Sequence, residues 1–254
     1  MKVITYNVNG LRAALKKDFI TWLRSENPDV LCLQETKMQE DQFEPADFID
    51  AGYPYCYLFS AKKKGYSGVA IISKVEPDAV IKGMGIDAYD DEGRFIRADF
   101  GDLSICSIYH PSGTSGDVRQ DFKMQWLEDF QEYCNTLRKE QPQLILCGDY
   151  NICHEPIDIH DPVRNAKNSG FLPEEREWMT RFLSDGYIDS FRLLHPEEQK
   201  YSWWSYRFSA RKNNKGWRID YCMLTDNMQD RLESAFILNE AVHSDHCPVG
   251  VIVK

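Results

Sequence analysis

Short apolar runs alternate with amphipathic segments along the chain, and the apolar runs end in polar side chains. A β-rich run at residues 3–6 leads into Asn7, and a second run at residues 30–33 leads into Glu35. Between them, residues 11–26 carry apolar side chains at helical spacing, which predicts one amphipathic helix. A glutamate after an apolar strand usually marks only the point where solvent begins. Taken alone, Glu35 therefore does not identify a site.

Residues 53–109 show no long helical period. Their short β-rich runs are broken by Gly, Pro and Asp, which predicts an antiparallel meander whose last strand ends at Tyr109. One of its turns, residues 62–66, carries three lysines and Tyr66. Such a turn is either an ordinary solvated loop or a cationic tip that contacts a ligand.

The hydrophobic pattern of the rest of the chain predicts two further helices and three further strands. The helices are expected at about residues 116–139 and 173–183, and the strands at residues 144–147, 219–224 and 248–253. No linker, repeat or low-complexity segment separates these elements. We therefore expect residues 1–254 to form a single domain.

The strand at residues 144–147 is uniformly apolar and stops at Gly148, with Asp149 and Asn151 just beyond it. A continuous apolar run is typical of a strand that is covered on both faces. Two residues apart in extended chain, Asp149 and Asn151 emerge on one side, at the edge where open α/β sheets place their chemistry. The alternative is an Asx turn, for which Gly, Asp and Asn are all common residues.

Composition indicates a soluble globular protein: 43% of the 254 residues are hydrophobic, and no run is long enough to span a membrane. The N-terminus reaches polar residues too early for a secretory leader, so we expect a cytoplasmic protein without a membrane partner. Eight cysteines without a C-x-x-C pair predict reduced thiols. The net charge of -10 requires that any nucleic acid be met by a local cationic surface.

Residues 201–218 interleave aromatic side chains with arginines and lysines. This composition is typical of surfaces that stack bases or sugars and contact phosphates. A core strand followed by a charged loop has a similar composition. The number of indoles beside the cations favours binding.

Six motifs together resemble, in order, those of the exonuclease III family of apurinic/apyrimidinic (AP) endonucleases, in the DNase I-like endonuclease/exonuclease/phosphatase superfamily. They are Asn7 with Gly10-Leu11-Arg12, Leu33-Gln34-Glu35-Thr36-Lys37, Gly65-Tyr66-Ser67-Gly68, Gly148-Asp149-Tyr150-Asn151, Gly216-Trp217-Arg218-Ile219-Asp220-Tyr221 and Ser244-Asp245-His246-Cys247-Pro248. The resemblance spans essentially the whole chain. It implies an α/β fold, a four-layer sandwich of two packed mixed β-sheets flanked by helices.

The resemblance also implies an activity: a DNA repair phosphodiesterase that incises 5′ to abasic sites and leaves a 3′-hydroxyl, with 3′ to 5′ exonuclease and 3′-end-cleaning activity. The implied cofactor is Mg²⁺, with Mn²⁺ as a substitute. The implied metal set is Glu35, Asn7, Asp149, Asn151, Asp245 and His246. The implied catalytic set is Asp149, Asn151, His246, Asp220 and Tyr109, in which Asp149 activates water and Asp220 orients His246.

The implied partner is double-stranded DNA with abasic sites or 3′ ends, bound by a prokaryotic, nucleoid-associated monomer that needs no nucleotide cofactor. The implied DNA contacts are Asn165, Asn168, Tyr66, Trp203, Arg207 and Trp217, with the two tryptophans lining a pocket for the base-free sugar. Five positions depart from other members: Asn9 stands where some members have an aspartate, Ser112 and Ser115 replace longer polar or basic groups, and Arg207 and Trp203 replace smaller or apolar residues.

Two alternatives stay open. A phosphodiesterase or phosphatase for inositol phosphates or sphingolipid on the same sandwich shares the Asp149/Asn151 and Asp245/His246 pattern. Nothing requires such an enzyme to carry Asn165, Asn168, Trp203 and Trp217 together. A catalytically silent DNA-binding regulator is expected to have lost a reactive group, whereas all of them are present in this sequence.

Overall fold

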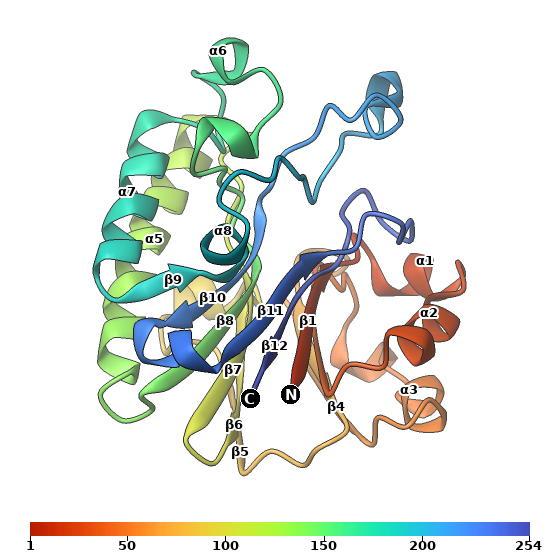
Figure 1. Cartoon of the computed structure of the whole chain (residues 1–254). Helices are drawn as coiled ribbons and strands as arrows, with labels where there is room; N and C mark the ends of the chain where they lie inside the picture. The colour runs from red at the N-terminus through yellow and green to blue at the C-terminus, as the bar shows by residue number, and fades with distance from the viewer.

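Two six-stranded β-sheets pack face to face, with helices on the outer face of each, in a computed structural model that describes residues 1–254 (Figure 1). The first sheet has the order β11 (Leu232–Ile237), β12 (Val249–Val253), β1 (Lys2–Asn7), β2 (Val30–Gln34), β4 (Val69–Ser73), β3 (Tyr55–Phe59). The second has the order β5 (Ala79–Lys82), β6 (Phe95–Phe100), β7 (Leu103–Tyr109), β8 (Gln143–Asp149), β10 (Asp220–Thr225), β9 (Tyr187–Asp189). The predicted four-layer α/β sandwich is confirmed.

Most of the helices form the two outer layers. The first sheet is covered by α1 (Leu11–Leu15), α2 (Phe19–Glu26) and α3 (Ala46–Asp50). The second sheet is covered by α4 (Asp87–Asp90), α5 (Asp117–Leu137) and α7 (Pro173–Ser184). Of the other two helices, α6 (Pro162–Asn165) lies beyond the sheets, and α8 (Ser190–Leu194) packs against β10 of one sheet and β11 of the other. None of these helices combines the length and apolar character needed to cross a bilayer.

The alternation of side chains along β8 explains why its sequence is apolar throughout. Ile145 and Cys147 lie in the core between the sheets, whereas Leu144 and Leu146 lie in the core beneath α5 and α7. Successive side chains of a strand point to opposite faces, so a strand covered on both sides has no polar face. The apolar run therefore places the end of β8, and Asp149 with it, deep within the sandwich.

Two secondary-structure predictions were wrong in part. Residues 11–26 form two helices, because the chain turns at Asp18, whose φ of 62° lies in the left-handed region. The meander predicted for residues 53–109 is divided between the sheets, since β3 and β4 pair in the first and β5, β6 and β7 in the second. β11 escaped prediction because it is a half-exposed edge strand with a bulge between Leu232 and Ser234.

Strand register brings distant polar residues to one end of the sandwich. In the first sheet Asn7 pairs with Gln34, the residue before Glu35. In the second sheet Tyr109 and Asp220 both pair with Asp149, one from each side. The sandwich therefore gathers five strand ends into one place.

Candidate active site

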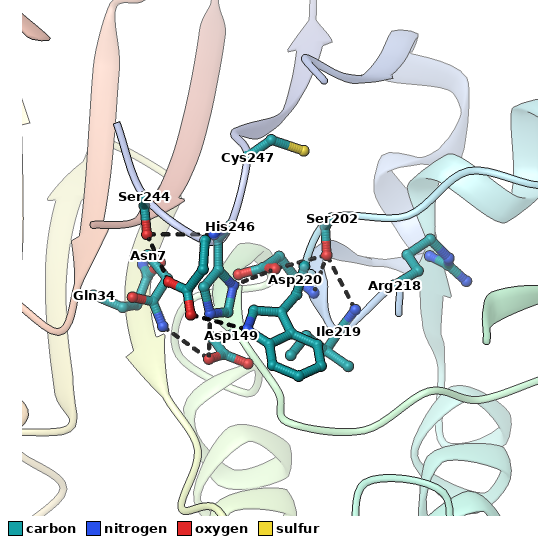
Figure 2. Close-up of polar contacts among 12 residues, drawn as sticks. Asn7, Gln34, Asp149, Ser202, Arg218, Ile219, Asp220, Ser244, His246 and Cys247 are labelled. Carbon is teal, nitrogen blue, oxygen red and sulfur yellow. Dashed lines mark hydrogen bonds and ion pairs between the residues drawn. The ribbon is translucent and has the colours of Figure 1, made fainter. Parts of the chain in front are cut away.

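Asn7 joins the two sheets through its side-chain amide. Its Nδ2 donates to Glu35 Oε1, beside it in the first sheet, and to Asp149 Oδ2 of the second, each at 2.9 Å. Its Oδ1 accepts from the backbone N–H of Asn9 at 3.0 Å. Figure 2 shows Asn7 beside Asp149 and His246. The amide of a fully buried asparagine thus holds two carboxylates from different sheets close together.

Glu35 lies just after β2 with a left-handed backbone, φ 49°. A glutamate has no intrinsic preference for this conformation, which costs about 1–2 kcal/mol in an L-residue. Backbone hydrogen bonds hold the turn in place: Gly10 N donates to Glu35 O at 2.7 Å, and Thr36 N donates to Gly68 O at 3.1 Å. Lys37 Nζ lies 2.9 Å from Glu35 Oε2. The turn directs the carboxylate to the cluster instead of to solvent.

Asp149 and Asp220 are each 1% exposed and are the most enclosed acids of the cluster. Asp149 Oδ1 accepts from the backbone N–H of Asn151 at 2.8 Å. Gly148 precedes it because a Cβ there would lie 1.8 Å from the carbonyl oxygen of Ile108 on the adjacent strand. Burial, and then repulsion from Asp220, raises the pKa of Asp149 to about 7. The group can therefore exchange a proton near neutral pH.

His246 and Asp220 form a buried charge-assisted pair. His246 Nδ1 lies 2.8 Å from Asp220 Oδ2, and Ser202 Oγ donates to the same oxygen at 2.6 Å (Figure 2). Burial is the largest single influence and lowers the pKa of the imidazole, but the charge and hydrogen bond of Asp220, together with the charges of Asp149 and Asp245, outweigh it and raise the pKa of His246 to about 10. His246 Nε2, the free ring nitrogen, lies 3.9 Å from Asp149 Oδ2. The imidazole is thus held protonated beside the second carboxylate.

Asp245 forms the outer edge of the cluster. Its Oδ1 accepts from Asn9 Nδ2 at 2.9 Å, and its Oδ2 accepts from Trp203 Nε1 at 3.1 Å. Burial works against ionisation, but the charge of His246 and the hydrogen bonds from Asn9 and Trp203 lower the pKa of Asp245. Lys37 Nζ donates to Asn9 Oδ1 and so links this edge to Glu35. Asn9, at a position where some members of the resembled family have an aspartate, acts here as a hydrogen-bonding bridge.

The cluster fits a divalent cation. One ligand atom from each of Glu35, Asp149 and His246 lies within 4.8 Å of the other two. Oδ1 of Asp220 is buried without a hydrogen-bond partner, so unsatisfied negative charge remains beside them. Carboxylate oxygens are the ligands that hard cations prefer. The protonated state of His246 makes Glu35 and Asp149 the more suitable direct ligands.

A cavity of about 330 Å³ opens beside the cluster. Its lining includes the reactive side chains Glu35, Tyr109, Asp149, Asn151, Asp245 and His246, the tryptophans Trp203 and Trp217, and Ser112, Ser169 and Gly170. The two indoles meet edge to face with ring centroids 5.9 Å apart. Their backbones pair in both directions at 2.9 Å, and Trp203 also bridges to His246. An aromatic wall thus adjoins the polar cluster.

The other predicted DNA contacts lie outside this cavity. Asn165 is the last residue of α6, which projects from the end of the molecule to which β1 runs (Figure 1), and Asn168 Nδ2 donates to its Oδ1 at 2.7 Å. Asn168 is exposed and lines an adjoining groove with Trp203 and Trp217. Arg207 is exposed in a 3₁₀ turn, Arg207–Ser209, and does not line the cavity.

Tyr66 belongs to a second polar cluster that the sequence did not reveal. Its hydroxyl accepts from Arg94 Nη2 at 2.9 Å and from Arg119 Nη2 at 3.3 Å, and the ring of Tyr109 lies 4.7 Å from the Arg94 guanidinium. Burial, and then the charge of Glu35, raises the pKa of Tyr109 well above its usual range, so its hydroxyl stays protonated. Arg94 and Ser202 sit in ordinary strand and loop contexts. No local pattern distinguishes them.

Comparison with known proteins agrees with this geometry. The model of the Endonuclease/Exonuclease/phosphatase family matches residues 4–246. An exodeoxyribonuclease of Bacillus subtilis is 45% identical over 258 residues, covering 100% of both chains. Two solved structures superpose with a TM-score of 0.92 over 100% of this chain and 99% of each of theirs: an AP endonuclease from Archaeoglobus fulgidus, 32% identical, and a 3′ phosphatase from Neisseria bound to a product DNA hairpin, 30% identical.

Proposed function

The chain belongs to the Endonuclease/Exonuclease/phosphatase family and is a nuclease of that family, and from this premise we propose that it repairs DNA at abasic sites. It incises the strand 5′ to the base-free sugar, leaves a 3′-hydroxyl, and also removes nucleotides and blocking groups from 3′ ends. The named activities of its relatives, an exodeoxyribonuclease, an AP endonuclease and a 3′ phosphatase, support each part. We further propose that it acts as a cytoplasmic monomer.

One observation carries the proposal: a buried carboxylate with a raised pKa and a protonated imidazole lie 3.9 Å apart at the mouth of an aromatic cavity. Hydrolysis of a phosphodiester requires a base for the attacking water and donors for the charge that develops on phosphorus-bound oxygens. Asp149 supplies the base. His246 and Tyr109 supply donors.

Glu35, with Asp149 and the outlying Asp245, would hold Mg²⁺, or Mn²⁺ in its place, and the bound ion would supply positive charge to offset that of the phosphate oxygens. Asn7 holds the carboxylates of Glu35 and Asp149 close together by donating a hydrogen bond to each. Asn151 holds Asp149 through its backbone N–H, and its Nδ2, which donates one hydrogen to the carbonyl oxygen of His110, offers its second hydrogen to the phosphate. The residues therefore have separable roles in binding the ion and in moving the proton.

The proton transfers follow from the two pKa shifts. Asp149, with a pKa raised by burial to about 7, accepts a proton from water at neutral pH. His246, whose pKa is raised to about 10 because Asp220, Asp149 and Asp245 together outweigh the opposing effect of burial, donates a hydrogen bond or a proton to the phosphate. Asp220 fixes the ring so that Nδ1 faces the carboxylate and Nε2 faces the cavity side.

Substrate selection follows from the size of the cavity. A base-free deoxyribose is smaller than a nucleotide, and its extrusion from the duplex forfeits little stacking. Trp203 and Trp217 bound the space that it enters. We assign Asn165, Asn168, Tyr66 and Arg207 to contacts with the flanking phosphates, which position the duplex without reading its sequence.

Two end-labelled duplexes test the proposal, one with a single abasic-site analogue and one fully paired with a recessed 3′ end. We expect a cut immediately 5′ to the analogue with Mg²⁺ and no product with EDTA. Asp149→Asn and His246→Asn should each abolish the cut while leaving duplex affinity largely intact. A variant that cuts at the wild-type rate would contradict the role assignment. Absence of any product from wild-type protein would favour the inositol-phosphate or sphingolipid alternative.

A further inference from the structure

A fully buried ion pair lies behind the wall of the cavity. Lys123 of α5 and Glu175 of α7 are both 0% exposed, and Lys123 Nζ lies 2.6 Å from Glu175 Oε1. Removing two charges from water costs more than their attraction usually returns, and well-packed apolar residues in their place are often neutral or stabilising. Stability alone therefore does not account for this pair.

Lys123 holds the backbone of Asn151. Its Nζ donates to the carbonyl oxygen of Asn151 at 2.8 Å. Asn151 is also held by its N–H on Asp149 and by its Nδ2 on the carbonyl oxygen of His110 at 3.0 Å. The Lys123 ammonium thus makes the third of three hydrogen bonds that hold Asn151 in place. Asn151 lines the cavity and has a left-handed backbone, φ 52°.

Glu175 holds the opposite stretch of the wall. Its Oε2 accepts from the backbone N–H of Gly170 at 2.6 Å and of Leu172 at 3.0 Å. Its Oε1 accepts from Gln120 Nε2 at 3.0 Å and from Ser169 Oγ at 3.3 Å, besides Lys123. Five donors therefore converge on one buried carboxylate and fix the segment from residue 169 to residue 172.

Gly170 connects the segment held by Glu175 to Trp217 in the aromatic wall. A Cβ at Gly170 would lie 2.8 Å from the Trp217 ring and 3.2 Å from Asn151 O, so the three groups are in close contact. The backbone of Gly170 is also tied to Cys153, whose N–H donates to its carbonyl oxygen at 2.7 Å. The location of this glycine thus sets how far Trp217 stands from Asn151.

From these contacts we propose that Lys123 and Glu175 are positioning residues that set the width of the substrate cavity, and through it the preference for a base-free sugar over an intact nucleotide. Neither touches the substrate. They act through Asn151, Gly170 and Trp217. The assignment rests on the proposed function, because the cavity is taken to receive the extruded deoxyribose.

The decisive variant is the double substitution Lys123→Met/Glu175→Gln, which removes both charges and nearly preserves volume. Glutamine retains an oxygen for Gly170 N, so the fold is expected to persist, while the single variant Lys123→Met leaves an unpaired buried charge and should be less stable than the double. The matched control is Arg97→Met/Asp99→Asn, which removes a mostly buried pair on β6, with Nε and Oδ1 2.9 Å apart, that does not line the cavity.

The measurement is a ratio of dissociation constants in EDTA, for a duplex with an abasic-site analogue against the same duplex intact, at a temperature where circular dichroism shows each protein folded. With Mg²⁺, the ratio of kcat/KM for incision to that for 3′ shortening gives a second reading. We expect both preferences to fall at least tenfold in Lys123→Met/Glu175→Gln and to stay unchanged in the control.

A folded double variant with wild-type preferences would overturn the positioning role alone, and so would an equal loss in the control. Failure of the proposed function gives a different pattern, because the wild-type protein would then show no preference for the abasic duplex in either assay. That result would overturn both proposals.

Discussion

Replacing Asp220 by asparagine tests whether the imidazole of His246 must stay protonated during catalysis. Asp220 is 1% exposed, and its Oδ2 lies 2.8 Å from His246 Nδ1. An asparagine has the same shape and leaves Ser202 an acceptor, but it removes the negative charge. The variant therefore separates the electrostatic effect of the carboxylate from its packing.

The pKa of His246 indicates the size of the effect. Burial opposes protonation, and Asp220 is the largest of the charges that together raise this pKa from 6.5 to about 10. That rise corresponds to a preference of about 5 kcal/mol for the imidazolium. Without the charge of Asp220, burial dominates, and the pKa should fall to about 7 or below. Because the imidazole of His246 would also be less well oriented, we expect the rate constant of the chemical step in Asp220→Asn to fall by about 10²–10³-fold.

The assay is single-turnover incision of the abasic duplex in Mg²⁺ between pH 6 and pH 9.5. A group needed in its protonated form supports activity below its pKa, and that activity is lost as the pH rises through the pKa. Wild-type protein should therefore keep its rate to about pH 9, whereas Asp220→Asn should lose about tenfold per pH unit above roughly pH 7. Ser202→Ala removes the 2.6 Å donor to Asp220 and the acceptor of the backbone N–H groups of Ile219 and Asp220, but it keeps the charge of Asp220 and should leave the basic limb in place. An unchanged basic limb in Asp220→Asn would refute the reasoning.

Three further predictions concern the cavity, the sheet and the core. Trp203→Ala should weaken discrimination between abasic and intact duplexes at least tenfold, measured by competition binding; equal losses on both would assign Trp203 to the core. Gly148→Ala should lower the free energy of unfolding by about 2–3 kcal/mol in urea titrations, because its Cβ would lie 1.8 Å from Ile108 O. Burial lowers the pKa of His110 well below 6.5, so the unfolded chain binds the extra proton and stability falls as pH drops below 6.5. His110→Gln, which keeps an acceptor for Trp126 Nε1, should flatten that slope in urea midpoints taken at pH 5, 6 and 7.

The sequence predicts where the strands end better than it predicts that these strand ends lie close together in the fold. Alternating apolar and polar runs locate Asn7, Glu35 and Asp149 correctly, because burial of a strand and the polarity of the turn after it are local properties. Their convergence depends on register and on the packing of one sheet against the other. Short-range periodicity carries no information on either, and for these three residues only the family resemblance supplied it.

The same difference between local pattern and long-range contact explains why some polar residues around the site were not predicted from the sequence. Ser202 donates to Asp220 across 18 positions, and Arg94 reaches Tyr66 across 28. Serine and arginine are common in loops and on strands, so their types indicate nothing by themselves. Lys123 and Glu175 lie 52 positions apart on two helices whose patterns read as ordinary amphipathic surfaces. Buried polar groups of this kind become visible only once the layers are assembled.

Backbone strain shows that contacts with the rest of the fold, and not the intrinsic backbone preferences of the residues, impose the geometry of the site. Asn9, Glu35, Lys37 and Asn151 all have positive φ, between 46° and 52°. Asparagine tolerates this region, whereas glutamate and lysine pay roughly 1–2 kcal/mol each. Glu35 and Lys37 are held there by hydrogen bonds to Gly10 and to the loop before β4. If those contacts opened, the turn would relax to an extended backbone and carry the Glu35 carboxylate away from Asp149. The carboxylates and the imidazole of the site can therefore be assembled only while both sheets are intact and packed together.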